Sequence, residues 1–141
     1  MNPSPHRTGP TLALGASITG IVGSLGPWIT HPLGNANGTD GSAEGLITLG
    51  LFLLIAICAI VYFIGQESWG YGVFALSILA GGVGLWQAAD ISANIQQVPG
   101  AAIGWGLWLV IGSSFAAGIG GFLAAYFSTR PPAPRHYGRN L

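Results

Sequence analysis

The chain has 141 residues, a formal net charge of zero and 6% charged residues, against roughly 25% in ordinary soluble domains. Hydrophobic residues make up 50% of the chain, and 24 glycines come on top of them. So few charges cannot cover the surface of a soluble globule, whereas lipid needs no such cover. Without a basic field, we expect no nucleic acid partner. The single cysteine, Cys58, excludes an internal disulfide and lies in an apolar run as a small hydrophobic residue.

The first ten residues are rich in proline and predict a polar N-terminal tail, residues 1–10. Four apolar stretches without a charge then predict a transmembrane domain over residues 11–127, with spans at about 11–29, 46–64, 71–89 and 101–127. Each stretch is near or above the ~20 residues with which a helix crosses about 30 Å of hydrocarbon. A backbone in lipid must satisfy its own hydrogen bonds, so the predicted fold class is an all-α membrane protein, a bundle of four transmembrane helices.

The first span has an alternative interpretation as a cleaved signal peptide. Pro27, Trp28 and Pro32 interrupt the place where a small-residue cleavage site would lie, which favours a retained helix. Pro27 is expected to end or kink that helix just before Trp28, because proline disfavours helix at the residue before it.

Three connections join the spans: an outer loop at 30–45, an inner loop at 65–70 and an outer loop at 90–100. In the first, "HPLG" and "NGTDG" predict turns, because Asn and Asp bond their own backbone and glycine adopts positive φ. Pro99-Gly100 separates the third span from the fourth.

All the basic residues lie at the two ends of the chain: Arg7, Arg130, Arg135 and Arg139. By the positive-inside rule both termini are expected in the cytoplasm, with residues 128–141 as a Pro/Arg tail that can touch anionic headgroups. The outer loops carry Asp40, Glu44 and Asp90 and no Lys or Arg. We therefore expect a multi-pass protein of a bacterial plasma membrane, with an N-in/C-in topology.

Aromatic residues support this placement. Tryptophans gather near the predicted outer ends of the spans (Trp28, Trp86, Trp105, Trp108), and other aromatics near the inner ends (Trp69, Tyr62, Tyr126). This distribution is typical of interfacial belts, where amphipathic rings lie at headgroup level. The same tryptophans would also suit the lining of a ligand cleft.

Small residues recur every four positions in two of the spans. The first has Ala16, Gly20 and Ser24; the fourth has Gly112, Ala116, Gly120 and Ala124, with a parallel ridge of Ser113, Ala117, Gly121 and Ala125. Such ridges let membrane helices approach closely. We expect the first, third and fourth helices to pack together, and the bulky second helix to face lipid. The double ridge of the fourth helix equally suits self-association.

Two polar clusters are the candidate outer sites. Asp40 and Glu44 lie in the first outer loop, and Gln87, Asp90 and Asn94 share one face of the third helix. The simpler interpretation is turn formation, helix capping and a solvated helix end. The alternatives are a calcium site from the loop oxygens, a zinc site that includes His31, or a polar vestibule. The calcium spacing departs from the twelve-residue calcium loop, so no metal and no cofactor is assigned.

The sequence contains no pattern typical of a nucleophile–base pair, a phosphate loop or haem ligands, and no charge at the centre of a span. We therefore expect a non-catalytic integral membrane protein that acts by helix–helix association, as an accessory subunit of a membrane complex or as a homo-oligomer. The expected partners are the lipid bilayer and other membrane protein subunits or copies of the chain itself. The alternatives are a small pore or transporter with a polar outer mouth, and an envelope sensor that uses the outer loop.

The segments "LGPWIT…GTDG…GLITLGL" (residues 25–51) and "GWGLWLV" (residues 104–110) resemble a set of small, uncharacterised four-helix integral membrane proteins of actinobacteria. The resemblance covers most of residues 12–127 and implies a plasma-membrane protein, without an activity. The layout is also similar to that of claudins and tetraspan proteins. In claudins, however, the Trp motif precedes a cysteine pair between the first two spans, and here "WGLW" opens the fourth span, so this likeness is one of layout alone.

Overall fold

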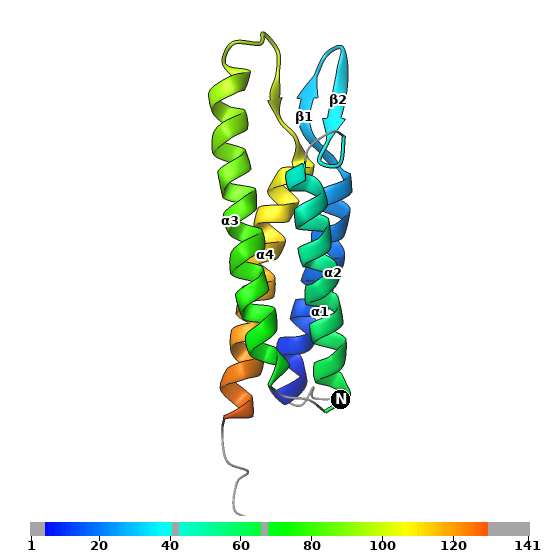
Figure 1. The fold of residues 1–141 in the computed structure, drawn as a ribbon, viewed down its shortest axis with the longest axis vertical. Helices are drawn as coiled ribbons and strands as arrows, with labels where there is room; N and C mark the ends of the chain where they lie inside the picture. Colours follow the sequence, from blue (N-terminus) through cyan, green and yellow to red (C-terminus); the bar gives the residue numbers. More distant parts are fainter. Residues whose placement is uncertain (1–4, 41–42, 66–67, 130–141) are drawn as a thin grey trace, which may run out of the picture.

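The computed structural model describes residues 5–40, 43–65 and 68–129. Four long helices run alternately up and down in chain order: α1 (Pro5–Leu25), α2 (Ala43–Phe63), α3 (Trp69–Ile95) and α4 (Trp105–Ser128). The two ends of the described chain lie at the same end of the bundle (Figure 1). The predicted C-terminal tail falls, from residue 130 onward, outside the described residues.

The helices bury several serines and one threonine, and each of these hydroxyls donates a hydrogen bond to a carbonyl oxygen of its own helix. Ser17 donates to the carbonyl oxygen of Leu14 (2.8 Å), and Ser114 donates to that of Val110 (2.7 Å). Among the described residues, no buried side-chain nitrogen or oxygen lacks a hydrogen-bond partner. Back-bonding of this kind lets a small polar residue lie inside an apolar bundle at little cost.

The four helices form a closed ring in which each packs on its neighbours. α1 packs most extensively on α4, followed by α3 on α4, α1 on α2 and α2 on α3. The expected grouping of the first, third and fourth helices is therefore wrong in two respects. α1 and α3 are not principal partners, and α2 buries one face of its own, which includes Phe52, Ile55 and Ala59. Its opposite, exposed face carries large aliphatic residues, as predicted.

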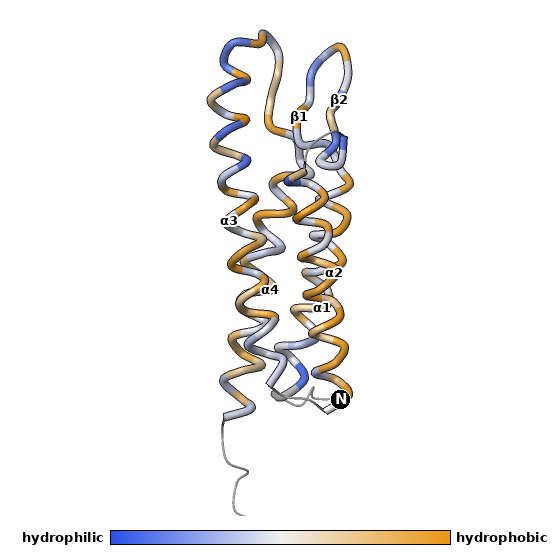
Figure 2. The backbone as a smooth tube through the Cα atoms, in the orientation of Figure 1, coloured by the Kyte–Doolittle hydropathy of each residue, from blue (hydrophilic) through white to orange (hydrophobic). Residues whose placement is uncertain are grey.

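Three of the four helices, α2, α3 and α4, are long and apolar enough to cross a membrane. α1 has the same length as α2 but is less apolar, because glycine, serine and threonine occupy much of it. Figure 2 shows the apolar residues along the bundle and a polar end on α3 beside the hairpin.

Two helices extend beyond the predicted spans. α1 begins at Pro5 and includes Pro10, so the predicted polar tail is helical over residues 5–10. The reason is tertiary contact, since a Cβ at Gly9 would lie 2.7 Å from the backbone of Gly120 and Ala124. α3 continues to Ile95 and replaces part of the expected 90–100 loop, because Ile91 and Ile95 pack against the core cluster.

A small three-stranded antiparallel sheet caps one end of the bundle. It contains β1 (Pro27–His31), β2 (Gly34–Asn37) and β3 (Ala102–Ile103) in the order β2-β1-β3. The all-α expectation is thus corrected: the molecule is mostly helical, with a sheet outside the helices. The connections from α1 to α2 and from α3 to α4 are not helical, so their backbone N–H and C=O groups have no helical partners. Strand pairing within the first connection and between the two connections provides these hydrogen bonds.

The two predicted turns of the first connection are confirmed. His31 pairs with Gly34 across a two-residue loop, and the Leu33 N–H donates to His31 Nδ1 at 3.1 Å. Gly34 has a φ of +152°, which L side chains rarely adopt. In the second turn, the Asn37 N–H donates to Asp40 Oδ2 at 2.9 Å.

Candidate functional site

The polar candidates of the first connection serve local structure. Asp40 is exposed, and its carboxylate holds the turn that ends β2. Glu44 is half-buried in the first turn of α2, where an acid suits the positive end of the helix dipole. His31 likewise accepts a hydrogen bond within its own turn.

The second polar cluster lies on the last turns of α3. Asn94 donates through Nδ2 to the Asp90 carbonyl oxygen (2.9 Å) and to Asp90 Oδ2 (3.3 Å), so these two residues pair along the helix. Gln87 is half-buried one turn earlier. Within residues 5–40, 43–65 and 68–129, no group of three or more His, Cys, Asp and Glu side chains is arranged to hold a metal ion.

The predicted ridge of α1 packs inside the chain. A Cβ at Gly20 would lie 2.3 Å from the ring of Phe52, so this glycine makes room for a large side chain of α2. Ser24 donates to the carbonyl oxygen of Gly20 (2.9 Å), and its Oγ lies 3.1 Å from Thr48 Oγ1. Ala16 is buried in the core.

The predicted ridge of α4 divides in two. Gly120 and Ala124 pack on α1, and a Cβ at Gly120 would lie 2.7 Å from the carbonyl oxygen of Gly9. A second close approach joins Gly106 to Gly23, with the Cβ of either one placed within 2.8 Å of the other's carbonyl oxygen. Ala116 is half-buried against the core, while a Cβ at Gly112 would meet no atom within 4 Å.

One face of α4, which includes Gly121 and Ala125 of the parallel ridge, packs on α3 in a regular antiparallel ladder. Each rung brings one glycine against a residue of the other helix: Gly70 against Ala125, Gly121 against Val73 and Phe74, Gly118 against Ser77, Gly81 against Ser114, and Gly84 against Ile111. Small residues of both ridges are therefore used within the chain, by α1 and by α3, whereas Gly112 is left open.

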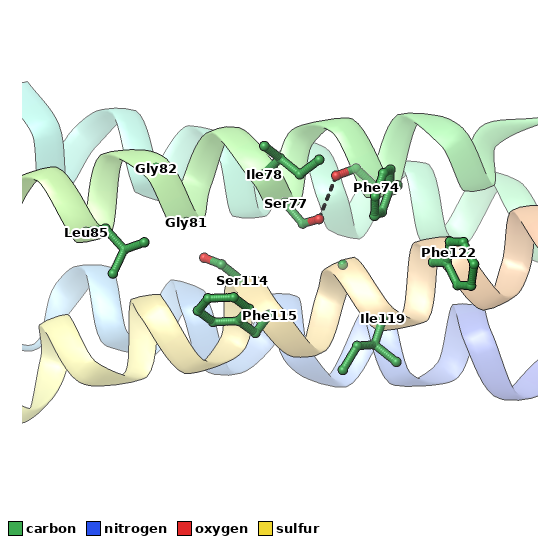
Figure 3. Close-up of a pocket in the computed structure, with 11 residues that line it drawn as sticks. Phe74, Ser77, Ile78, Gly81, Gly82, Leu85, Ser114, Phe115, Ile119 and Phe122 are labelled. Carbon is green, nitrogen blue, oxygen red and sulfur yellow. Dashed lines mark hydrogen bonds between the residues drawn. The ribbon is translucent and has the colours of Figure 1, made fainter.

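A groove opens on the outer side of this ladder, between α3 and α4 (Figure 3). Its volume is about 580 Å³, and its residues are Phe74, Ser77, Ile78, Gly81, Gly82, Leu85, Ser114, Phe115, Gly118, Ile119 and Phe122. Small residues form the floor, and large apolar residues form the walls. Because none of these side chains is ionisable, the groove is suited to binding an apolar group and offers no acid, base or metal ligand.

A second hollow of about 320 Å³ lies next to the first, toward the end where α3 begins and α4 ends. The two hollows share Phe74 and Phe122, whose ring centroids are 6.2 Å apart. The second hollow also includes Tyr71, Tyr126 and Thr129, so hydroxyl groups gather at this end of the groove.

The tryptophans of the predicted belt fall into two groups. Trp86, Trp105 and Trp108 are 72%, 52% and 58% exposed, as interfacial residues should be. Trp28 is only 2% exposed, so its assignment to the belt is wrong. Its indole donates through Nε1 to the carbonyl oxygen of Gly23 (3.1 Å), which also accepts a hydrogen bond from the Gly26 N–H (3.2 Å) at the end of α1.

Comparison of this chain with protein families, with curated proteins and with solved structures finds no match.

Sequence reasoning missed the groove, although its floor residues were visible as Ser77, Gly81 and Gly82 in the third span. The missing information was the pairing of helices, because a groove needs two helices of known register. The sheet was also missed, since β3 has only two residues and pairs with a segment more than seventy residues away.

Proposed function

We propose that the protein is a four-span integral membrane protein without catalytic activity that acts by helix–helix association in the plasma membrane. Three helices have the length and hydropathy of spans. The remaining helix, α1, is less apolar, but its packing with α4 is the most extensive of any helix pair. This packing supports its passage through the membrane beside α4. In this proposal both ends of the chain lie in the cytoplasm and the sheet lies outside, because the arginines are confined to the two ends.

One observation carries the association. Gly15 of α1 and Gly112 of α4 are helical glycines at which an added Cβ would meet no atom within 4 Å. A helical glycine costs about 1 kcal/mol relative to alanine, and at these positions no close approach within the chain compensates for it. Close contact with the helix of a partner would compensate for this cost, because small residues let membrane helices pack backbone to backbone.

Gly15 and Gly112 are the proposed contacts. Both are exposed, and Thr11 and Thr19 extend the small surface of α1 by one helical turn on either side of Gly15. The threonine hydroxyls are bonded to their own helix, Thr11 to Arg7 and Thr19 to Gly15, so this surface presents little polarity to a partner.

The test is the mass of the protein in lipid nanodiscs, together with the identity of any chain that co-purifies. We expect a homo-oligomer or a stoichiometric partner, and we expect Gly15→Leu or Gly112→Leu to release it while the helix content stays unchanged. Gly50→Leu, the same substitution on α2, is the matched control. A monomer of the bare chain, unaffected by any of these substitutions, would contradict the proposal.

A further inference from the structure

The groove between α3 and α4 has a floor that the fold itself fixes. A Cβ at Gly81 would lie 3.3 Å from Ser114 Cβ, and one at Gly118 would lie 3.1 Å from Ser77 Oγ, so both glycines lie at close contacts between the two helices. Gly82 differs, because a Cβ there would meet nothing within 4 Å. The space above Gly82 therefore belongs to the groove and not to the packing of the two helices.

The surface of the groove requires an apolar occupant. Its floor hydroxyls are already used, since Ser77 donates to the carbonyl oxygen of Phe74 (2.7 Å; Figure 3) and Ser114 donates to that of Val110 (2.7 Å). The walls are aromatic and aliphatic, with Phe115 and Ile119 among them. A polar ligand would lose its hydration here without gaining hydrogen bonds.

Polarity changes along the groove in one direction. At the end where α4 finishes, the adjoining hollow includes the phenol hydroxyls of Tyr71 and Tyr126, and Thr129, whose hydroxyl donates to the carbonyl oxygen of Tyr126 (2.9 Å). From Tyr71 to Leu85 the groove follows α3 for about 21 Å, at about 1.5 Å per residue. Half of the hydrocarbon core is about 15 Å thick, so this length matches a chain that enters at one membrane surface and passes the midplane.

Charge distinguishes the two ends of the bundle. The exposed Arg7 lies in the first turn of α1, at the end with the hydroxyls, whereas the acids of the described residues, Asp40, Glu44 and Asp90, lie at the opposite end. An anionic headgroup is favoured at the first end and disfavoured at the second.

We propose that this groove binds one acyl chain of an anionic phospholipid, with the lipid phosphate at the end defined by Tyr71, Tyr126 and Thr129. This inference rests on the proposed passage of the helices through the membrane, but not on the proposed association, which uses other faces of the bundle. The acyl chain fills the space over Gly82, and the headgroup lies at the end of the bundle that carries the hydroxyls and Arg7.

The experiment uses the full chain in nanodiscs that contain a phosphatidylglycerol with a photoreactive diazirine on its acyl chain. After illumination, mass spectrometry maps the labelled residues. We expect labelling concentrated on the groove, at Phe74, Phe115 and Ile119, well above that on the exposed aliphatic face of α2. In nanodiscs made with the matching phosphatidylcholine probe, groove labelling is expected to fall several-fold.

Gly82→Leu fills the groove without a clash inside the chain and is expected to reduce groove labelling by about tenfold, the effect of losing about two buried methylene contacts. Gly50→Leu makes the same change on α2 and should leave the labelling unchanged. Equal labelling of the groove and of the α2 face, or no loss in Gly82→Leu, would overturn the proposal. So would a change of mass in Gly82→Leu, because the occupant would then be a helix. The response of Gly15→Leu and Gly112→Leu in mass measurements tests the association separately.

Discussion

α4 meets two partners through two ridges of small residues, and the two interfaces differ in kind. Toward α1 the contact is backbone to backbone at two points, Gly9 with Gly120 and Gly23 with Gly106. Toward α3 the floor is equally close, but large side chains rise on both sides and leave a groove of about 580 Å³. Small residues decide how closely helices approach, and the residues beside them decide whether the interface is sealed or open.

The largest effect is expected from a side chain added where the backbones of α1 and α4 touch. In Gly106→Leu, the new Cβ would lie 2.7 Å from the carbonyl oxygen of Gly23, and backbone cannot move aside as a side chain can. We expect a loss of at least about 3 kcal/mol of unfolding free energy. Denaturant unfolding in mixed micelles, followed by circular dichroism, measures it. Gly112→Leu, on the same helix, should change it by less than about 0.5 kcal/mol.

The α3–α4 interface is tested by a matched pair of glycines. A Cβ at Gly121 would lie 2.6 Å from the Phe74 nitrogen, whereas one at Gly82 meets only open space. We expect Gly121→Leu to cost about 2–3 kcal/mol and Gly82→Leu close to nothing, measured by the same unfolding. Equal stabilities for the two variants would mean that α3 and α4 do not form the ladder described above.

These two tests also mark the limit of sequence-based prediction. The ridge positions on α4, Gly120 and Gly121 among them, are visible from their spacing alone. Their partners are not, because both ridges consist of the same small residues and the choice between them depends on which helices become neighbours. The start of α1 could not be predicted for a similar reason: Pro5 to Pro10 have the composition of a tail, and contact with α4 makes them helical.

Trp28 lies beside the contact of α1 with α4 at Gly23 and Gly106. Its indole N–H donates to the carbonyl oxygen of Gly23, the glycine that touches Gly106. Trp28→Phe keeps most of the ring and removes this donor, so we expect a loss of about 1 kcal/mol. Trp108→Phe, at a tryptophan that is 58% exposed, should have no measurable effect on unfolding. A larger loss of unfolding free energy for Trp108→Phe than for Trp28→Phe would contradict the structural role assigned to the Trp28 indole.

The smallest effect is expected at the third interface, between α1 and α2. Ser24 Oγ and Thr48 Oγ1 are 3.1 Å apart in a buried site. Interhelical hydrogen bonds in membranes contribute about 0.6 kcal/mol on average, so a double-mutant cycle of Ser24→Ala and Thr48→Val should give a coupling of that size. A coupling above about 1.7 kcal/mol would place this pair, and not the glycine contacts, at the centre of the bundle's stability.

The pairing of the first helix with the last has a consequence for biogenesis. In the proposed four-span arrangement, α1 reaches the membrane well before α4, and α1 is the least apolar of the four helices. Until α4 emerges, α2 is the main packing partner of α1 among the described helices. Synthesis of α4 is therefore the step that gives α1 its most extensive packing partner. Truncation before residue 105 should yield a product that membrane quality control removes.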